Sequence, residues 1–295
     1  ANPDSEILPL LGSKEGIMHI SMAFLNPGDK VLIPNPGYPT YQSVTRLLQA
    51  TPVFYNLSPE NDWQPDLEAL NQMDLNGVKI MWVNYPNMPT GANAKQETFR
   101  KLIDWVRERE ILLVNDNPYS FILTDRPHSM LSVPGAMEVG MELNSLSKSF
   151  NMAGWRVGMV LGNKENIKAL LKVKSNMDSG MFLGIQKGAI AALDINEIWF
   201  KQLNDTYTKR RKLTFKLAAL LNTEFDLRSS GLFVWAKLKD TNKSSVEVIE
   251  EILQKYNLFI TPGSIFGSQG EGYIRFSLCV KEDQINNAIK RITKK

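Results

Sequence analysis

The chain of 295 residues holds few of the residues from which proteins build disulfides and metal sites. Its single cysteine, Cys279, excludes an internal disulfide and a cysteine-based zinc knuckle. Its two histidines, His19 and His128, lie far apart in the sequence, and we therefore predict no metal site. His19 falls among apolar residues of a predicted helix, where a packed core histidine is the expected state.

The sequence also lacks long apolar runs and a strong excess of charge. No run approaches the roughly 18 apolar residues of a membrane span, and residues 1–11 lack the basic and apolar regions of a signal peptide. The 34 basic and 31 acidic side chains are mixed along the chain, with a net charge of +3, so no nucleic-acid-binding surface is expected. We therefore expect a reduced, soluble, cytoplasmic protein of one large or two medium domains.

What is present is an alternation of helix-like and strand-like segments over the first two thirds of the chain. The predicted helices are 13–25, 38–49 and 94–109, and the predicted strands are 30–33, 52–55, 78–83, 111–114, 139–143 and 157–161. This alternation is typical of crossover units, so the predicted fold class is α/β, with a mainly parallel sheet flanked by helices.

The last third of the chain has a different pattern, typical of a smaller α+β domain. Its predicted helices are 195–221, 245–256 and 282–292, and its predicted strands are 232–238 and 272–278. We therefore predict a large domain at 1–195 and a small C-terminal domain at 196–295.

Polar side chains follow the predicted strands at the point where each strand ends. Ligands of open α/β sheets bind at the carboxyl ends of the strands, and this rim would collect Tyr38, Asn84, Asn87, Asp116, Tyr119, Ser145, Ser147 and Lys148. Residues 12–14 (GSK) open a helix whose N–H groups and dipole suit a phosphate. A lysine, a carboxylate, an aromatic face and a phosphate cradle are together what pyridoxal phosphate requires.

Residues 145–158 (SLSKSFNMAGWRVG) resemble the lysine signature of the class I/II aminotransferases, which are fold type I pyridoxal-phosphate enzymes. Further motifs occur in the order of this family: GSK at 12–14, PGY at 36–38, YPNMPTG at 85–91, DNPY at 116–119, SG at 230–231, and PG at 262–263 before Arg275. The resemblance implies a seven-stranded, mainly parallel sheet in the large domain. It also implies pyridoxal 5′-phosphate as cofactor, an amino acid and a 2-oxo acid as substrates, and a homodimer without nucleic-acid or membrane partners.

The resemblance implies catalytic roles for Lys148, Asp116 and Tyr119. Lys148 would form a Schiff base with the cofactor aldehyde and, once released, move a proton at the substrate Cα. Asp116 would keep the pyridine nitrogen protonated, so that the ring withdraws electrons. Tyr119 would donate to the ring oxygen O3′, and Tyr38 would stack on the ring face.

The resemblance also assigns residues to the phosphate and to the substrate. The phosphate would be held by the Arg156 guanidinium, together with Gly12, Ser13, Lys14, Ser145 and Ser147. Local capping of a helix is the alternative for the two later serines. Arg275 matches the arginine that binds the substrate α-carboxylate, and a solvent-facing arginine on an edge strand is the alternative.

The sequence departs from the family pattern at two places. Met88 stands where the family commonly has an asparagine that donates to O3′, and methionine cannot donate. Tyr119 would then hold this oxygen alone, or Asn87 would reach in. Family members also carry a segment before the phosphate loop that contributes to the small domain and the dimer. The loop here begins at Gly12, so we expect impaired substrate closure and activity for the chain as given.

The resemblance is to the branch that contains aspartate and LL-diaminopimelate aminotransferases, through residues 175–180 (SNMDSG) and 263–272 (GSIFGSQGEG). It predicts acidic or diaminopimelate-like substrates, and Lys14 would meet either a distal substrate carboxylate or the phosphate. One alternative is a lyase or decarboxylase with the same cofactor. The other is a non-catalytic, aminotransferase-like sensor domain of a transcription regulator.

Overall fold

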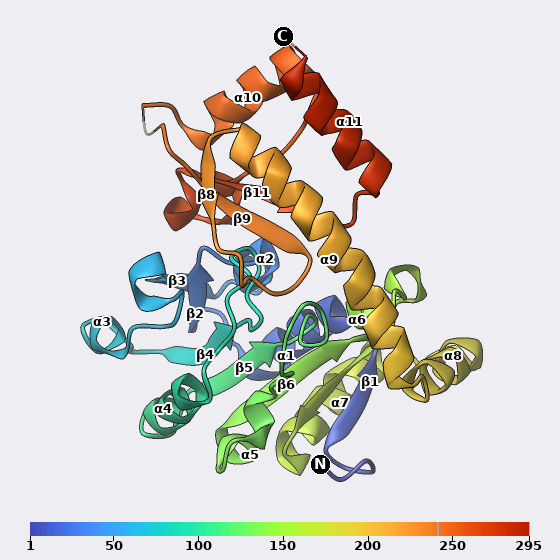
Figure 1. Ribbon diagram of the computed structural model, residues 1–295. Coiled ribbons are helices and arrows are strands. Elements are labelled where there is room, and N and C mark those ends of the chain that lie inside the picture. Colours follow the sequence, from blue (N-terminus) through green and yellow to red (C-terminus); the bar gives the residue numbers. More distant parts are fainter. Residues whose placement is uncertain (241, 295) are drawn as a thin grey trace.

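The computed structural model describes residues 1–240 and 242–294, and its larger part is built on a seven-stranded sheet (Figure 1). The strand order is β1-β7-β6-β5-β4-β2-β3. Neighbours from β3 to β6 run parallel, whereas β7 is antiparallel to both β6 and β1. The strands are β1 (Ile7–Leu10), β2 (Lys30–Asn35), β3 (Thr51–Asn56), β4 (Val78–Val83), β5 (Leu112–Asp116), β6 (Gly140–Ser145) and β7 (Gly158–Gly162). The predicted α/β class and the mainly parallel, seven-stranded sheet are confirmed.

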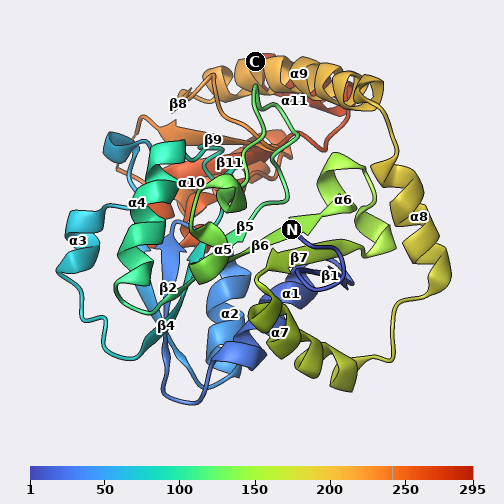
Figure 2. The same ribbon diagram turned by 90° about the horizontal axis from the view of Figure 1, so that it is seen from below.

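Helices cover both faces of this sheet, and the alternation of side chains along its strands explains why. In β4, Ile80 and Trp82 pack into one apolar core, while Met81 and Val83 pack into another on the opposite face. Figure 2 shows α1, α2 and α7 on one side and α4 and α5 on the other. The helices are α1 (Ser13–Phe24), α2 (Pro39–Leu47), α3 (Leu67–Asn71), α4 (Gln96–Arg107), α5 (Ala136–Val139), α6 (Leu146–Ser149), α7 (Lys164–Met177) and α8 (Leu183–Leu193).

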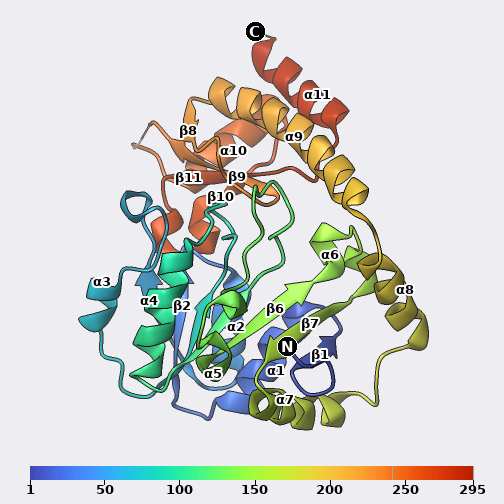
Figure 3. The same cartoon turned by 60° about the horizontal axis from the view of Figure 1, so that its bottom comes forward.

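The C-terminal part carries its own antiparallel sheet, and its apolar core also includes Met88, Tyr119 and Ile122 of the larger part. The strand order is β10-β11-β9-β8, and helices α9, α10 and α11 pack against it. Its elements are α9 (Glu197–Leu220), β8 (Thr223–Phe225), β9 (Phe233–Leu238), α10 (Ser245–Tyr256), β10 (Thr261–Pro262), β11 (Tyr273–Ser277) and α11 (Glu282–Thr293). In Figure 3 the carboxyl ends of the central parallel strands point toward this smaller sheet.

The predicted division at 195/196 falls immediately before α9, whose N-cap is Asn196. The Asn196 side chain accepts a hydrogen bond from the Ile198 amide and so satisfies one of the open N–H groups of the helix. The division of the chain into two domains at this residue stays a prediction.

Two elements, β1 and α8, lack a sequence signal strong enough to predict them. Strand β1 has only four residues and contains Pro9, and it becomes a strand because it pairs with β7. Helix α8 is rich in apolar residues and has little amphipathic character, so periodicity does not mark it. By contrast, α4 buries Phe99, Leu102, Ile103 and Val106 on one face, as its periodicity predicts.

Candidate active site

A cavity of about 550 Å³ lies where the carboxyl ends of the parallel strands face the smaller sheet. Its lining residues come from both parts of the chain: Ser13, Lys14, Tyr38, Tyr41, Asn84, Met88, Asp116, Pro118, Tyr119, Ser145, Ser147, Lys148, Ala153, Arg156, Phe233 and Arg275. A larger cavity of about 670 Å³ lies beside α9 and α11 and is lined mostly by apolar residues. The smaller cavity is therefore the candidate active site, because it gathers the lysine, the carboxylate and two arginines.

One wall of the cavity is built to hold an anion. Gly12, with φ of 87°, is the N-cap of α1, and the following N–H groups of this 12-residue helix point outward from its positive end. A Cβ at Gly12 would lie 2.3 Å from Nη2 of Arg156, so only glycine lets this guanidinium reach the helix start. Nη1 of Arg156 donates to the Ala153 carbonyl at 2.9 Å and lies 3.5 Å from the Ser147 hydroxyl.

Both later serines of this wall lie where β6 leads into α6: Ser145 ends β6 and is the N-cap of α6, and Ser147 lies in α6. The Ser145 hydroxyl accepts from the Ser147 amide at 3.2 Å, so the alternative of local capping describes one contact of Ser145 correctly. Because the Ser145 hydroxyl only accepts in this contact, its proton is still available for a ligand. Ser147 lines the cavity beside Arg156. Lys14 also lines the cavity, and its Nζ lies 5.7 Å from the ring centroid of Tyr38.

The opposite wall presents a buried carboxylate. Asp116 ends β5, and its Oδ2 accepts a hydrogen bond of 2.9 Å from the Tyr41 hydroxyl. Its Oδ1 is buried and has no hydrogen-bond partner among the residues that the structure describes. Burial raises the pKa of Asp116 from its ordinary 3.8 to about 6, although the Tyr41 bond lowers it in part. A cationic N–H group placed at Oδ1 would satisfy this oxygen and favour the charged carboxylate.

Aromatic residues surround Asp116 and hold it in place. Tyr41 stacks on Trp82 with ring centroids 5.0 Å apart, and Asn84 donates to the Asp116 carbonyl at 2.6 Å. Tyr38 meets Tyr41 edge-on at 5.6 Å and lines the cavity. The pKa of Tyr119 is raised, first by burial and then by the Asp116 charge, so its hydroxyl stays protonated and can donate.

Lys148 lies between these two walls. It follows β6 by three residues, in the single turn of α6, and its half-buried side chain lines the cavity. The sheet places Asp116 in register with Leu143 of β6, so the carboxylate and the lysine follow neighbouring strands.

Arg275 reaches the cavity from the smaller sheet. It lies on β11, which pairs with β9 and β10, so the alternative of a solvent-facing edge-strand arginine is wrong. Its guanidinium lies 4.0 Å from the Phe233 ring centroid and 4.6 Å from that of Phe266. Desolvation by this burial lowers the pKa of Arg275. Its Nε is buried without a hydrogen-bond partner in residues 1–240 and 242–294, so the group is held by packing against these rings and by one contact from Nη1.

Met88 lines the cavity, and its Sδ lies 3.3 Å from Nη1 of Arg275. The Asn87 side chain instead accepts from the Thr90 amide and hydroxyl, and it is not among the described residues that line the cavity. The Asn87 Nδ2 is buried without a hydrogen-bond partner among the described residues, so a role for Asn87 as substitute donor stays a prediction.

Sequence reasoning places Asn84 at this rim without a role, and it does not indicate Tyr41 or Phe233. Tyr41 bonds the carboxylate, Asn84 fixes its backbone, and Phe233 packs on Arg275. Tyr41 lies three residues after Tyr38 in α2, so helical spacing could have indicated it. Nothing in the sequence indicates Phe233, because its contact with Arg275 crosses from β9 to β11. His19 is buried, as predicted, and residues 1–240 and 242–294 contain no cluster suited to a metal.

Comparison with known proteins agrees with this geometry. The sequence model of the family "Aminotransferase class I and II" matches residues 1–292. The chain is 40% identical to the LL-diaminopimelate aminotransferase of Aquifex aeolicus and 42% identical to that of Natranaerobius thermophilus. Each match covers 99% of this chain and 76% of the relative. The apo structure of BacF from Bacillus subtilis is 34% identical, with a TM-score of 0.94 over 99% of this chain and 79% of that one.

The chain therefore belongs to the class I and II aminotransferase family, and its enzyme class is that of the transaminases. It spans about three quarters of the length of the curated relatives that it matches. Within the described residues, no helix has the length and apolar character needed to cross a bilayer.

Proposed function

We propose that this aminotransferase uses pyridoxal 5′-phosphate, bound in the cavity between the two sheets. The observation that carries the proposal is Asp116, which lines the cavity and whose buried Oδ1 has no hydrogen-bond partner among the described residues. The helix start at Gly12 and the Arg156 guanidinium provide a separate place for a phosphate. When bound, pyridoxal phosphate supplies an aldehyde that an amine can attack and a protonated ring that withdraws electrons.

Different residues of the cavity would bind the phosphate and the ring of the cofactor. Arg156, Ser13 and Ser147 line the cavity and would hold the phosphate, and the Asp116 carboxylate would accept the ring N–H. The protonated Tyr119 hydroxyl would donate to the ring oxygen, and Tyr38 would cover the ring face. These contacts would fix the ring before substrate arrives.

Lys148 and Arg275 act on the substrate. The Arg275 fork binds the α-carboxylate that amino acids and 2-oxo acids share, and the desolvated pocket between two phenylalanines strengthens this pairing. Once free of the cofactor aldehyde, the Lys148 amine would take the proton from the substrate Cα as general base and would deliver it to the cofactor carbon C4′ as general acid.

Borohydride reduction tests the cofactor and the lysine together. In the protein loaded with pyridoxal phosphate, reduction and peptide mass spectrometry should find the cofactor mass on Lys148. Lys148→Ala should lose this label and at least a hundredfold in turnover, while the exposed Lys168→Ala on α7 should keep both. A label on another lysine, or no bound cofactor, would overturn the proposal.

We also propose acidic or diaminopimelate-like amino acids as substrates. The names of the relatives at about 40% identity support this. Lys14 supports it too, because it lines the cavity and could bind a distal carboxylate while Arg275 binds the α-carboxylate. Single-turnover reactions with diaminopimelate, aspartate and aromatic donors should rank diaminopimelate or aspartate first. Lys14→Met should then weaken donors with a distal carboxylate more than aromatic donors. A preference for aromatic donors would contradict the proposed substrate class.

A homodimer is the proposed assembly, supported by apolar side chains around α8. Phe182 is 75% exposed and Ile190 62% exposed, and Leu183 and Leu193 are also exposed. Apolar surface gathered along one element is typical of a subunit interface. Sedimentation should therefore find a dimer that Ile190→Asp shifts toward monomer. The control Leu227→Asp, at an equally exposed leucine outside α8, should stay dimeric. A monomeric unmodified protein would refute the assembly.

A further inference from the structure

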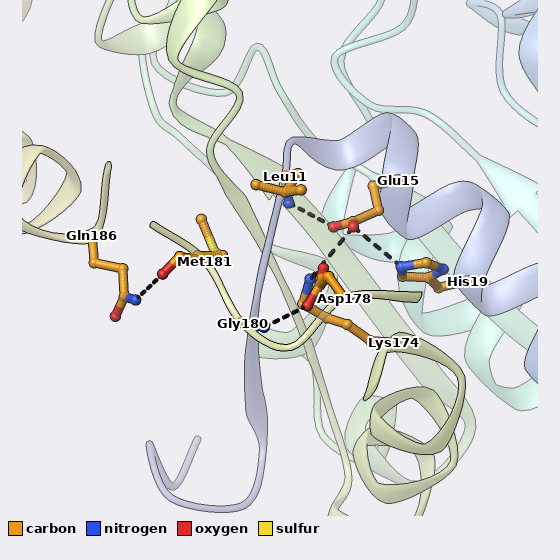
Figure 4. Close-up of polar contacts among 8 residues, drawn as sticks. All are labelled: Leu11, Glu15, His19, Lys174, Asp178, Gly180, Met181 and Gln186. Carbon is orange, nitrogen blue, oxygen red and sulfur yellow. Dashed lines mark hydrogen bonds and ion pairs between the residues drawn. The ribbon is translucent and has the colours of Figure 1, made fainter. Parts of the chain in front are cut away.

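A buried lysine outside the cavity connects the turn after α7 to the cavity wall formed by Gly12, Ser13, Lys14 and Arg156, which we call the phosphate wall (Figure 4). Lys174 lies on α7 and is only 6% exposed. Its Nζ lies 2.5 Å from Oδ2 of Asp178 and 3.4 Å from Oε1 of Glu15, which belongs to α1. Two carboxylates from different elements therefore share one buried ammonium group.

Glu15 links Lys174 to the phosphate wall through a hydrogen bond to the backbone. Its Oε2 accepts a hydrogen bond of 2.6 Å from the Leu11 amide, one residue before Gly12. Its Oε1 also lies 3.2 Å from Nε2 of the buried His19, one turn further along α1. Glu15 thus holds the backbone at the entry of α1, where Gly12 must keep its positive φ.

Asp178 is the second carboxylate that contacts the Lys174 ammonium group. It is the C-cap of α7, and its Oδ1 accepts from the Gly180 amide at 3.1 Å, so it orders the turn that leads toward α8. The hydrogen bond from Lys174 lowers the pKa of Asp178 and keeps its carboxylate charged, despite partial desolvation.

A buried ion pair of this kind is poor evidence for stability, because desolvation offsets most of the attraction between the charges. An apolar residue at 174 would pack between α1 and α7 without that penalty. What the ammonium group provides is orientation: it fixes Glu15, and Glu15 fixes the Leu11 amide and the turn that presents N–H groups to the phosphate.

We propose that Lys174 and Glu15 are positioning residues that hold the 11–14 turn in its phosphate-binding conformation. This inference rests on the proposed pyridoxal-phosphate function. It predicts that loss of the pair weakens recognition of the phosphate group and leaves recognition of the ring unchanged, since Asp116 and Tyr119 lie on other elements.

The test compares two probes on cofactor-free protein: pyridoxal phosphate and pyridoxal, which is the same ring without the phosphate. Lys174→Met should raise the dissociation constant for pyridoxal phosphate on the order of tenfold, the usual effect of losing one charge-assisted hydrogen bond. The dissociation constant for pyridoxal should stay the same. Lys172→Met, at an exposed lysine on the same helix, should change neither value.

Two further variants keep the test decisive if Lys174→Met folds poorly. Lys174→Arg retains the cation and should bind pyridoxal phosphate nearly as the unmodified protein does. Glu15→Gln retains an acceptor for the Leu11 amide but loses the charge that faces Lys174, so it should lose phosphate affinity selectively.

Equal weakening of both probes by Glu15→Gln would show general damage and would overturn the inference, as would unchanged affinities in Lys174→Met and Glu15→Gln. Failure of the unmodified protein to bind pyridoxal phosphate would instead refute the proposed function, so the two failures are distinguishable.

Discussion

Asp116 combines a functional requirement with an energetic cost. A carboxylate that must meet a cationic ring is buried before the ring arrives, with one oxygen bonded to Tyr41 and the other without a partner among the described residues. The sequence predicts Asp116 because it lies two residues after the predicted apolar strand 111–114. It does not predict the Tyr41 contact, which depends on how α2 packs against β5, and such packing is set by the whole fold.

The cost should be measurable in the cofactor-free protein. The pKa of Asp116 is raised from 3.8 to about 6 in the folded state, so the native protein binds this proton more tightly than the unfolded chain does. Stability is therefore lost as pH rises from about 4 to about 6, by about 3 kcal/mol in total. Asp116→Asn should lack this loss.

Urea unfolding of both proteins at several pH values gives the difference directly, because every other titrating group is shared. Asp116→Asn should be the more stable protein above pH 7 and should match the unmodified one near pH 4. A constant difference across this range would show that Asp116 titrates normally. The same substitution should lower transaminase activity, since an asparagine cannot keep the ring nitrogen protonated.

At the scale of the element, the strand-turn-helix unit β1–Gly12–α1 decides the geometry of the phosphate wall. The GSK motif and the helix after it are predictable from local signals, but β1 is not. Pro9 and the short length of β1 hide it, and pairing with β7 creates it. Local sequence therefore predicts the anion site but not the strand that anchors it.

Gly12→Ala tests this unit, and Gly28→Ala is a matched control. Both glycines have positive φ, of 87° and 90°, so each alanine should strain the backbone, by roughly 1–3 kcal/mol at Gly12, whose ψ is 160°. Only at Gly12 would the new Cβ meet Arg156, whereas nothing lies within 4 Å of a Cβ at Gly28. Calorimetric titration should find weaker binding of inorganic phosphate in Gly12→Ala alone. Equal affinities in the two variants would mean that Arg156 moves aside without loss.

At the scale of the whole molecule, the active site lies between two sheets. The sequence predicts the strands of each sheet but not how the two sheets pack together. Motif order predicts the members Lys148 and Arg275, and the structure brings them to one cavity. Residues that act between the sheets, such as Phe233, escape prediction because strand pairing across β9 and β11 is not encoded by local spacing. The proposed domain boundary at 195/196 would place Lys148 in one domain and Arg275 in the other.

Arg275→Lys measures how much the smaller sheet contributes to substrate binding. Lysine keeps the charge but loses the planar fork and the stacking on Phe233 and Phe266. KM should rise about tenfold or more for both the amino donor and the 2-oxo acceptor, because both carry the α-carboxylate. Steady-state kinetics with each substrate varied in turn would measure this. An increase for one substrate alone would assign Arg275 to the distal group instead.

The position of β1 at the end of the seven-stranded sheet has a further consequence. An end strand of four residues, paired on one side only by β7, is among the first parts of a fold to open in thermal fluctuations. Because β1 leads into the turn at Gly12, each opening would also dismantle the anion site. Ligand and strand are therefore coupled: phosphate at the helix start should slow amide hydrogen exchange at Ile7, Leu8 and Leu10, although these residues precede the 11–14 turn.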